Sequence, residues 1–532
     1  MHDSRIRPVS LRVFLAAAFT ALLSLSVVPN SSDADDKEPL AAGNHAEAVT
    51  WLNRKLSSVA ASGPLRLVWL LDESRNMPDD RRALLESLHT LYSELDDDTD
   101  TVVISFGANA RIMTKAPLVN TIPGFAQLRR AFDRTPFDES GQENMCLGIS
   151  FAVNELSRQA DIDGRQLAIV ALTDESPFES GDTTSAGDEL EQTIQLCRKE
   201  KVPVYVIGRE AIFGKPTARI IWKDPVYQLS HWVQINRGPE TAYPYRLQWN
   251  GLNEIKDSWP SAFGPYSHER LCLETTGGFF ILQPTSNIDD FKHRRAAMVG
   301  YEPSLATRRE AALAISRSPL RSECRSVIEI LNPQIDKKLN LSDIDYSTNK
   351  EEFLSHASKD FKNGGYALAL LDEAIKRLEK VRPAREQEPS KRWMANYDLL
   401  LAQCQTYRFR LIQYLLVLDR HAATSPEPSN NKHNRWTMQS IHATTQPTPD
   451  EHARLKKLLG INTPLEDFIK LQETRQTVAN TALKQVIASH PGTPWASAAQ
   501  SELGRGFGLS LKSTFRSPRY QEVGKRIKIP AF

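Results

Sequence analysis

The chain has 532 residues, too many for a single hydrophobic core, so two to four domains are expected. Its 66 Lys and Arg residues nearly balance 65 Asp and Glu residues, and the net charge of +1 gives no reason to expect a nucleic-acid partner. Hydrophobic residues make up 40% and charged residues 25%, which is ordinary for a soluble globular protein.

Residues 1–34 have the layout of a secretory signal peptide. Three arginines precede an uncharged apolar run from Val13 to Val28, and small and polar residues follow, with cleavage expected near Ala34. The competing interpretation is an uncleaved membrane anchor, but this run is shorter than the roughly 20 residues that a spanning helix needs. No other stretch of the sequence could span a membrane. The sequence therefore predicts an exported protein, periplasmic or extracellular.

Residues 35–63 are predicted to form a polar leader and one short helix, and a regular alternation begins at residue 64. Strand-length apolar runs (RLVWLLD, TVVISFG, RQLAIVALTDE, PVYVIG) alternate with helical patterns such as RRALLESLHTLYSEL. Apolar strands that alternate with helices indicate an α/β fold with a mostly parallel sheet and helices on both faces.

Residues 209–267 interrupt this alternation with four tryptophans, four tyrosines and many Pro and Gly residues. Short strands and turns are predicted there, as an insertion before the last helix of the α/β domain. One interpretation is a small satellite core that holds the insertion together. The other is a surface on which exposed aromatic rings, with Arg219, Arg237 and Arg246, recognise carbohydrate or protein.

From about residue 300 the strand patterns end, and an all-α domain is predicted over residues 300–420. Residues 421–450 are polar and rich in Pro and Asn, which predicts a flexible loop, and residues 451–515 are helical again. The stretch ALKQVIASHPGTPWASAAQSEL resembles a tetratricopeptide-like (TPR-like) repeat; a helical bundle with Trp495 in its core is the alternative. Residues 516–532 are predicted to be a basic, solvated tail.

Five cysteines lie far apart and form no CxxC motif. An odd number in an exported protein argues against a disulfide framework, and buried thiols are the favoured interpretation. One disulfide remains open.

Oxygen-bearing side chains follow the strands where ligands bind in parallel α/β sheets, at the carboxyl ends. They are Asp72, Ser74 and Asn76 after the first strand, Thr173, Asp174 and Glu175 after RQLAIVAL, and Asp138, Ser140, Glu143 and Asn144 between them. Hard divalent cations prefer such ligands.

The D-x-S-x-N ending of the first strand, the TD ending of RQLAIVAL, and the segments VPVYVIG and LETTGGFF resemble the von Willebrand factor A (vWA) family. The resemblance covers residues 64–283 apart from the insertion, and it implies a Rossmann-like vWA domain with a metal-ion-dependent adhesion site. Asp72, Ser74 and Asp174 match that site. Asn76 stands where a second Ser is usual, and Glu143 stands where a Thr is usual. The resemblance thus implies an atypical site for Mg²⁺ or Ca²⁺, in which an open coordination position takes a carboxylate from the partner.

The same residues have other interpretations. If the register differs, Ser140 supplies the hydroxyl in place of Glu143. Asp, Ser and Asn are also the preferred helix N-cap residues, so Asp72 could cap the following helix or organise its loop. Glu143 would equally suit the first turn of a helix.

The resemblance implies an exported scaffold that binds a protein or a surface ligand through the vWA domain and is not an enzyme. The alternative is a hydrolase that uses the acidic cluster, with the insertion as a lid. The sequence contains no HExxH, GxSxG or P-loop motif in support of it. A third possibility is a non-binding structural remnant of the site.

Overall fold

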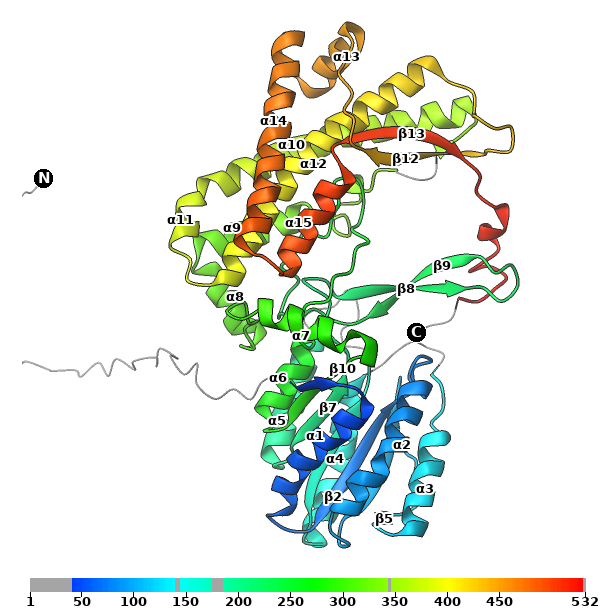
Figure 1. Cartoon of the computed structure of the whole chain (residues 1–532), viewed down its shortest axis with the longest axis vertical. Helices are drawn as coiled ribbons and strands as arrows, with labels where there is room; N and C mark the ends of the chain where they lie inside the picture. Colours follow the sequence, from blue (N-terminus) through cyan, green and yellow to red (C-terminus); the bar gives the residue numbers. More distant parts are fainter. Residues whose placement is uncertain (1–40, 139–143, 175–184, 343–345, 530–532) are drawn as a thin grey trace, which may run out of the picture. The chain divides into compact units, whose positions relative to one another are not determined.

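The computed structural model describes residues 41–138, 144–174, 185–342 and 346–529 (Figure 1). Leu40–Phe532 form one compact unit. The expected signal peptide, Ser140, Glu143 and Glu175 lie outside the described residues. Among the helices of the described ranges, none combines the length and the apolar composition needed to cross a membrane.

A mixed sheet forms the centre of the N-terminal part. Within the described residues it has eight strands in the order β1-β10-β7-β6-β2-β3-β4, with β5 also paired to β3. The strands are β1 (Ala41–Gly43), β2 (Leu65–Asp72), β3 (Asp100–Phe106), β4 (Ala110–Ile112), β5 (Leu118–Val119), β6 (Gln166–Leu172), β7 (Val204–Gly208) and β10 (Gly278–Leu282). All pairings are parallel except those of β4 and β5 with β3. The predicted mostly parallel sheet is confirmed.

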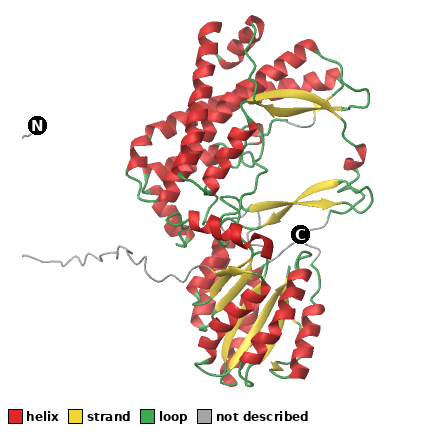
Figure 2. Cartoon of the chain, viewed as in Figure 1, coloured by secondary structure: helices red, strands yellow, loops and turns green. Residues whose placement is uncertain are grey.

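Helices cover both faces of this sheet (Figure 2). They are α1 (His45–Ala60), α2 (Pro78–Glu94), α3 (Ile122–Asp133), α4 (Met145–Ile162), α5 (Ser185–Lys199) and α6 (Tyr266–Glu274). Alternate side chains of β2 point to opposite faces. Leu67 and Trp69 pack with α1, α2 and α3, whereas Val68 and Leu70 pack with α4, α5 and α6. Burial on both faces explains why β2 is apolar at nearly every position.

The sheet and its helices begin earlier than residue 64. β1 pairs with β10, and α1 begins with a capping box between Asn44 and Glu47. Trp51 of α1 packs against the rings of Tyr205 and Phe280. Residues 41–60 therefore belong to the sheet domain, although the sequence predicted a separate leader and helix.

The insertion lies between β7 and α6, as predicted, and contains the antiparallel hairpin β8 (Thr217–Lys223) and β9 (Ser230–Asn236). Its aromatic residues differ in environment: Trp249 is fully buried against Tyr407 of the helical part, whereas Trp232 is exposed. Part of the insertion is thus core, as the first interpretation held, and part is surface.

The C-terminal part is mainly helical. Its helices are α7 (Ile288–Ala297), α8 (Arg308–Ser316), α9 (Pro319–Ile330), α10 (Lys350–Lys380), α11 (Arg382–Glu386), α12 (Lys391–Thr424), α13 (Pro449–Leu459), α14 (Leu465–Ser489) and α15 (Pro494–Arg505). Trp495 is fully buried in a core shared by α12, α14 and α15. The alternative of a helical bundle around Trp495 agrees with this packing, and the TPR-like interpretation stays a prediction.

A three-stranded antiparallel sheet accompanies these helices, in the order β11-β12-β13. Its strands are β11 (Tyr346–Ser347), β12 (Arg435–Ile441) and β13 (Gly508–Thr514). β12 lies inside the predicted flexible loop 421–450, so that prediction is wrong for residues 435–441. Trp436 and Met438 alternate inward and pack on the helical core, which orders the segment despite its polar surroundings.

All five cysteines are buried, as the favoured interpretation held, and each is a free thiol in this structure.

Candidate functional site

The sheet brings two predicted site residues together at its carboxyl-end edge. β2 and β6 are parallel neighbours, with Leu71 paired to Leu172. Asp72 is the last residue of β2, and Asp174 follows β6 by two residues. Asp72, Ser74, Asn76 and Asp174 meet at this edge and are called the rim cluster below.

Both carboxylate oxygens of Asp72 accept hydrogen bonds from the protein. The Ser74 backbone N–H donates to Oδ1 (2.8 Å), and the Thr173 hydroxyl donates to Oδ2 (2.5 Å). Burial, and then the neighbouring charge of Asp174, raise the pKa of Asp72 to about 7. Asp72 therefore organises its own loop. It does not cap α2, because the N-cap of that helix is Met77.

Asp174 accepts from the other two members of the rim cluster. Asn76 Nδ2 donates to Asp174 Oδ2 (2.5 Å), and the Ser74 hydroxyl lies 3.5 Å from Oδ1. The other atom of the Asn76 amide, Oδ1, is buried and has no hydrogen-bond partner within the described residues. Burial raises the pKa of Asp174, and Arg237 opposes this shift.

Arg237 is a fifth member of the site, which the sequence placed only in the insertion. It follows directly after β9. Its Nη1 donates to the backbone oxygen of Asp174 (2.7 Å), and its Nη2 lies 3.2 Å from Asp174 Oδ2. The two residues are 63 positions apart in the chain, so no local pattern could have joined them.

Further charged groups surround the rim cluster. Arg81 donates to the backbone oxygen of Asp72. Asp80 accepts from His45 (2.8 Å) and forms an ion pair with Arg209, which follows β7. Arg81 and Arg209 thus add positive charge next to the loop that contains Asp72.

Two residues of the loop before α4 are described. Asp138 accepts a hydrogen bond from the backbone N–H of Ala108. Asn144 caps α4 by accepting from Leu147 N (2.9 Å), and its Nδ2 donates to Glu189 (2.8 Å). Asp138 therefore stabilises a loop, and Asn144 stabilises the first turn of a helix.

A divalent cation at the rim cluster would need several oxygen ligands directed at one point. The carboxylates and the Ser74 hydroxyl are suitable oxygen ligands for Mg²⁺ or Ca²⁺. However, Asn76 turns its amide nitrogen toward Asp174, and the Arg237 guanidinium is bound to the same carboxylate. In this arrangement the described side chains do not fit a divalent cation.

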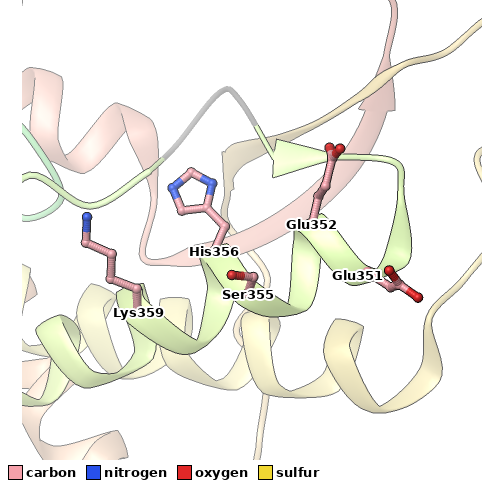
Figure 3. A pocket seen from close by; sticks show the side chains of 5 residues that line it. All are labelled: Glu351, Glu352, Ser355, His356 and Lys359. Atoms are coloured by element: carbon pink, nitrogen blue, oxygen red, sulfur yellow. The ribbon is translucent and has the colours of Figure 1, made fainter.

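The helical part contains a pocket that His356 helps to line. It is an open depression of about 560 Å³ lined by five side chains of α10 (Figure 3). The Ser342 hydroxyl lies 2.7 Å from His356 Nε2, and Asp360 Oδ2 lies 3.8 Å from the same nitrogen. A Ser–His–Asp triad needs the hydroxyl and the carboxylate on opposite ring nitrogens. This cluster therefore is not such a triad.

The family model of the von Willebrand factor type A domain matches residues 67–234. No curated protein matches the chain. Among solved structures, a von Willebrand factor type A protein from Catenulispora acidiphila is 14% identical, with 45% of this chain and 44% of that chain covered and a TM-score of 0.28. This chain thus spans less than half the length of that protein.

Two further solved structures are matched over nearly their whole length. The conserved hypothetical protein BatB from Bacteroides thetaiotaomicron is 16% identical over 44% of this chain and 98% of its own, with a TM-score of 0.26. An aerotolerance-related membrane protein from Bacteroides fragilis is 15% identical over 43% and 95%, with a TM-score of 0.24.

The matched residues 67–234 begin in β2 and include both strands that bring Asp72 and Asp174 together. The sheet around them is mostly parallel and has helices on both faces, as the family resemblance predicted. The chain contains a von Willebrand factor type A domain.

Proposed function

We propose that the chain is an exported, non-catalytic binding protein that contacts a partner protein with its rim cluster and the adjoining hairpin β8–β9. The observation that supports this most is an exposed apolar pair on the hairpin. Ile221 and Trp232 face each other across the two strands, and their exposed fractions are 57% and 66%. Exposed Trp and aliphatic side chains side by side are typical of binding surfaces.

The hairpin is held in place from its other face and from its turn. Ala218 and Ile235 are buried there against Ile212. The Asp224 carboxylate accepts backbone hydrogen bonds around the turn, from Val226 (3.1 Å), Tyr227 (2.5 Å) and Leu229 (2.9 Å). An exposed pair on a fixed backbone loses little entropy on binding.

Positive charge borders the exposed pair. Arg219 and Lys223 lie on the same face of β8 as Ile221, two residues before and after it. The C-terminal segment contacts the hairpin, because Glu522 accepts from the Tyr227 hydroxyl (2.7 Å) and Arg519 lies over the Tyr227 ring. The partner expected from this surface has an apolar patch bordered by carboxylates.

Two parts of the prediction from sequence belong to this proposal. Export is supported by the signal-like layout of residues 1–34. A divalent cation at Asp72, Ser74, Asn76, Glu143 and Asp174 would take part only if Arg237 left Asp174 and Asn76 turned its amide oxygen to the cluster.

The test uses the exported chain, whose N-terminus should lie near residue 35, as bait for proteins of the exported fraction. Ile221→Ser with Trp232→Ser should weaken binding of an identified partner by about tenfold or more, since buried Trp anchors contribute about 2 kcal/mol. Ile162→Ser is the matched control, because Ile162 is 68% exposed but ends α4, at the opposite edge of the sheet. Equal partner affinity of the double variant and the wild type would overturn the proposal.

A further inference from the structure

The Arg237 guanidinium contacts Asp174 in the way that a bound metal cation would. Its guanidinium contacts two oxygens of the same residue, the backbone carbonyl at 2.7 Å and carboxylate Oδ2 at 3.2 Å. Only 17% of the Arg237 side chain and 4% of the Asp174 side chain are exposed. A paired contact of this kind, shielded from water, is stronger than a surface ion pair.

The remaining contacts of the rim cluster complement this arginine. Asn76 donates to the same oxygen, Asp174 Oδ2, and its buried Oδ1 has no partner in the described part of the chain. An amide turned this way stabilises a carboxylate without metal, whereas a metal ligand would present its oxygen. The orientation of Asn76 and the position of Arg237 therefore both indicate a rim cluster that is arranged without a metal ion.

The charge balance leads to the same conclusion. Asp72 and Asp174 are the two carboxylates of the rim cluster; Arg237 contacts the carboxylate of Asp174, and Arg81 donates to the backbone oxygen of Asp72. A dication placed beside Asp174 would be repelled by the Arg237 guanidinium at close range.

We propose that Arg237 is the resident cation of the rim cluster, so that the vWA domain of this chain keeps its binding edge ordered without a divalent metal. The insertion supplies this cation, and the same contact fixes the end of β9 to the sheet. A divalent cation binds the rim cluster well only after Arg237 is removed. The inference does not depend on the partner.

The experiment compares the exported wild-type chain with Arg237→Gln, which keeps hydrogen-bond donors but removes the charge. The wild type should have the same melting temperature in Mg²⁺, Ca²⁺ or EDTA. Arg237→Gln should melt lower in EDTA and gain stability as Mg²⁺ is added. Mn²⁺, followed by electron paramagnetic resonance, should bind the variant about tenfold or more tightly than the wild type, because a like charge has been removed.

Three controls separate this inference from others. Adding Asp174→Asn to Arg237→Gln should abolish the new Mn²⁺ binding. Arg219→Gln removes an arginine from the same hairpin and should leave metal binding at the wild-type level. Arg237→Lys keeps the charge and should stay insensitive to metal, which covers the case in which Arg237→Gln fails to fold.

A concentration-dependent rise in the wild-type melting temperature with Mg²⁺ or Ca²⁺, or equal Mn²⁺ binding by the wild type and Arg237→Gln, would overturn the inference. These readouts involve no partner. Failure here is thus distinguishable from failure of the proposed partner binding, which is measured with Ile221 and Trp232.

Discussion

At the scale of single residues, His268 shows how burial alone determines protonation. It lies in α6, is 1% exposed, and packs beside the ring of Phe279. Neither ring nitrogen has a hydrogen-bond partner among the described residues. Burial lowers the pKa of His268 from 6.5 to about 3, because nothing there compensates an imidazolium charge.

This pKa difference predicts acid sensitivity. As pH falls below 6.5 the unfolded chain binds a proton at His268 and the folded chain does not, so stability decreases until the folded pKa is reached. Between pH 7 and pH 5 this loss is about 2 kcal/mol. His268→Leu should remove it, as measured by urea unfolding at both pH values. His293→Leu, at an exposed histidine of α7, is the control; an equal reduction in that variant would contradict the assignment.

At the scale of elements, two helical glycines differ in the space around them. A Cβ on Gly148 of α4 would lie 3.0 Å from Phe106 Cβ and 3.1 Å from Leu70 Cδ1, so this glycine lets α4 approach the sheet. A Cβ on Gly504 of α15 would have no atom within 4 Å.

The same substitution should therefore have opposite effects in the two helices. Gly148→Ala should lower the free energy of unfolding by about 1–3 kcal/mol through overpacking. Gly504→Ala should raise it by about 0.5–1 kcal/mol, because alanine is the better helix former. Denaturant titration of both variants measures the two changes in the free energy of unfolding, and changes of the same sign would contradict the difference in packing between the two helices.

The elements also show what the sequence could reveal. Buried strands such as β2 were predictable, because burial on both faces leaves a continuous apolar run. β12 was not, since its apolar residues Trp436 and Met438 stand in a polar segment and gain order only from the helical core. β1 is three residues long, too short for a periodic signal, and is defined by its pairing with β10.

Part of the candidate site was likewise predictable from the sequence, and part was not. Asp72, Ser74, Asn76 and Asp174 were predictable because they follow strands whose ends must meet in a parallel sheet. Arg237 was not, because its contact with Asp174 depends on the path of the insertion. Sequence motifs therefore located the carboxylates, but only the structure shows which cation they contact.

At the scale of the whole molecule, a buried ion pair joins the insertion to the helical part. Arg392 of α12 donates to Glu240 (2.6 Å) and to the backbone oxygen of Tyr301 (2.7 Å). Its guanidinium also lies over the rings of Phe263 and Trp495. Both charged side chains are almost fully buried, so each depends on the other.

Arg392→Met should lower the free energy of unfolding by about 3–5 kcal/mol, because Glu240 would be left buried without a counter-charge. Calorimetry should show a lower melting temperature and a separation of the sheet and helical transitions. Arg382→Met, which removes an exposed partner of Glu379, should lower the free energy of unfolding by only about 0–1 kcal/mol. Equal losses in the two variants would refute a role of the Arg392 pair in joining the two parts.

The five buried thiols have a practical consequence for following how the molecule opens. Cys146, Cys197 and Cys272 lie in the sheet domain, and Cys324 and Cys404 lie in the helical part. Burial raises the pKa of each thiol, and alkylating reagents attack the thiolate. Each cysteine therefore becomes reactive only when its own surroundings unfold. The native chain thus has cysteines in both halves whose alkylation reports local unfolding. Mass spectrometry of the alkylated peptides can follow the unfolding of each half without any added labelling site.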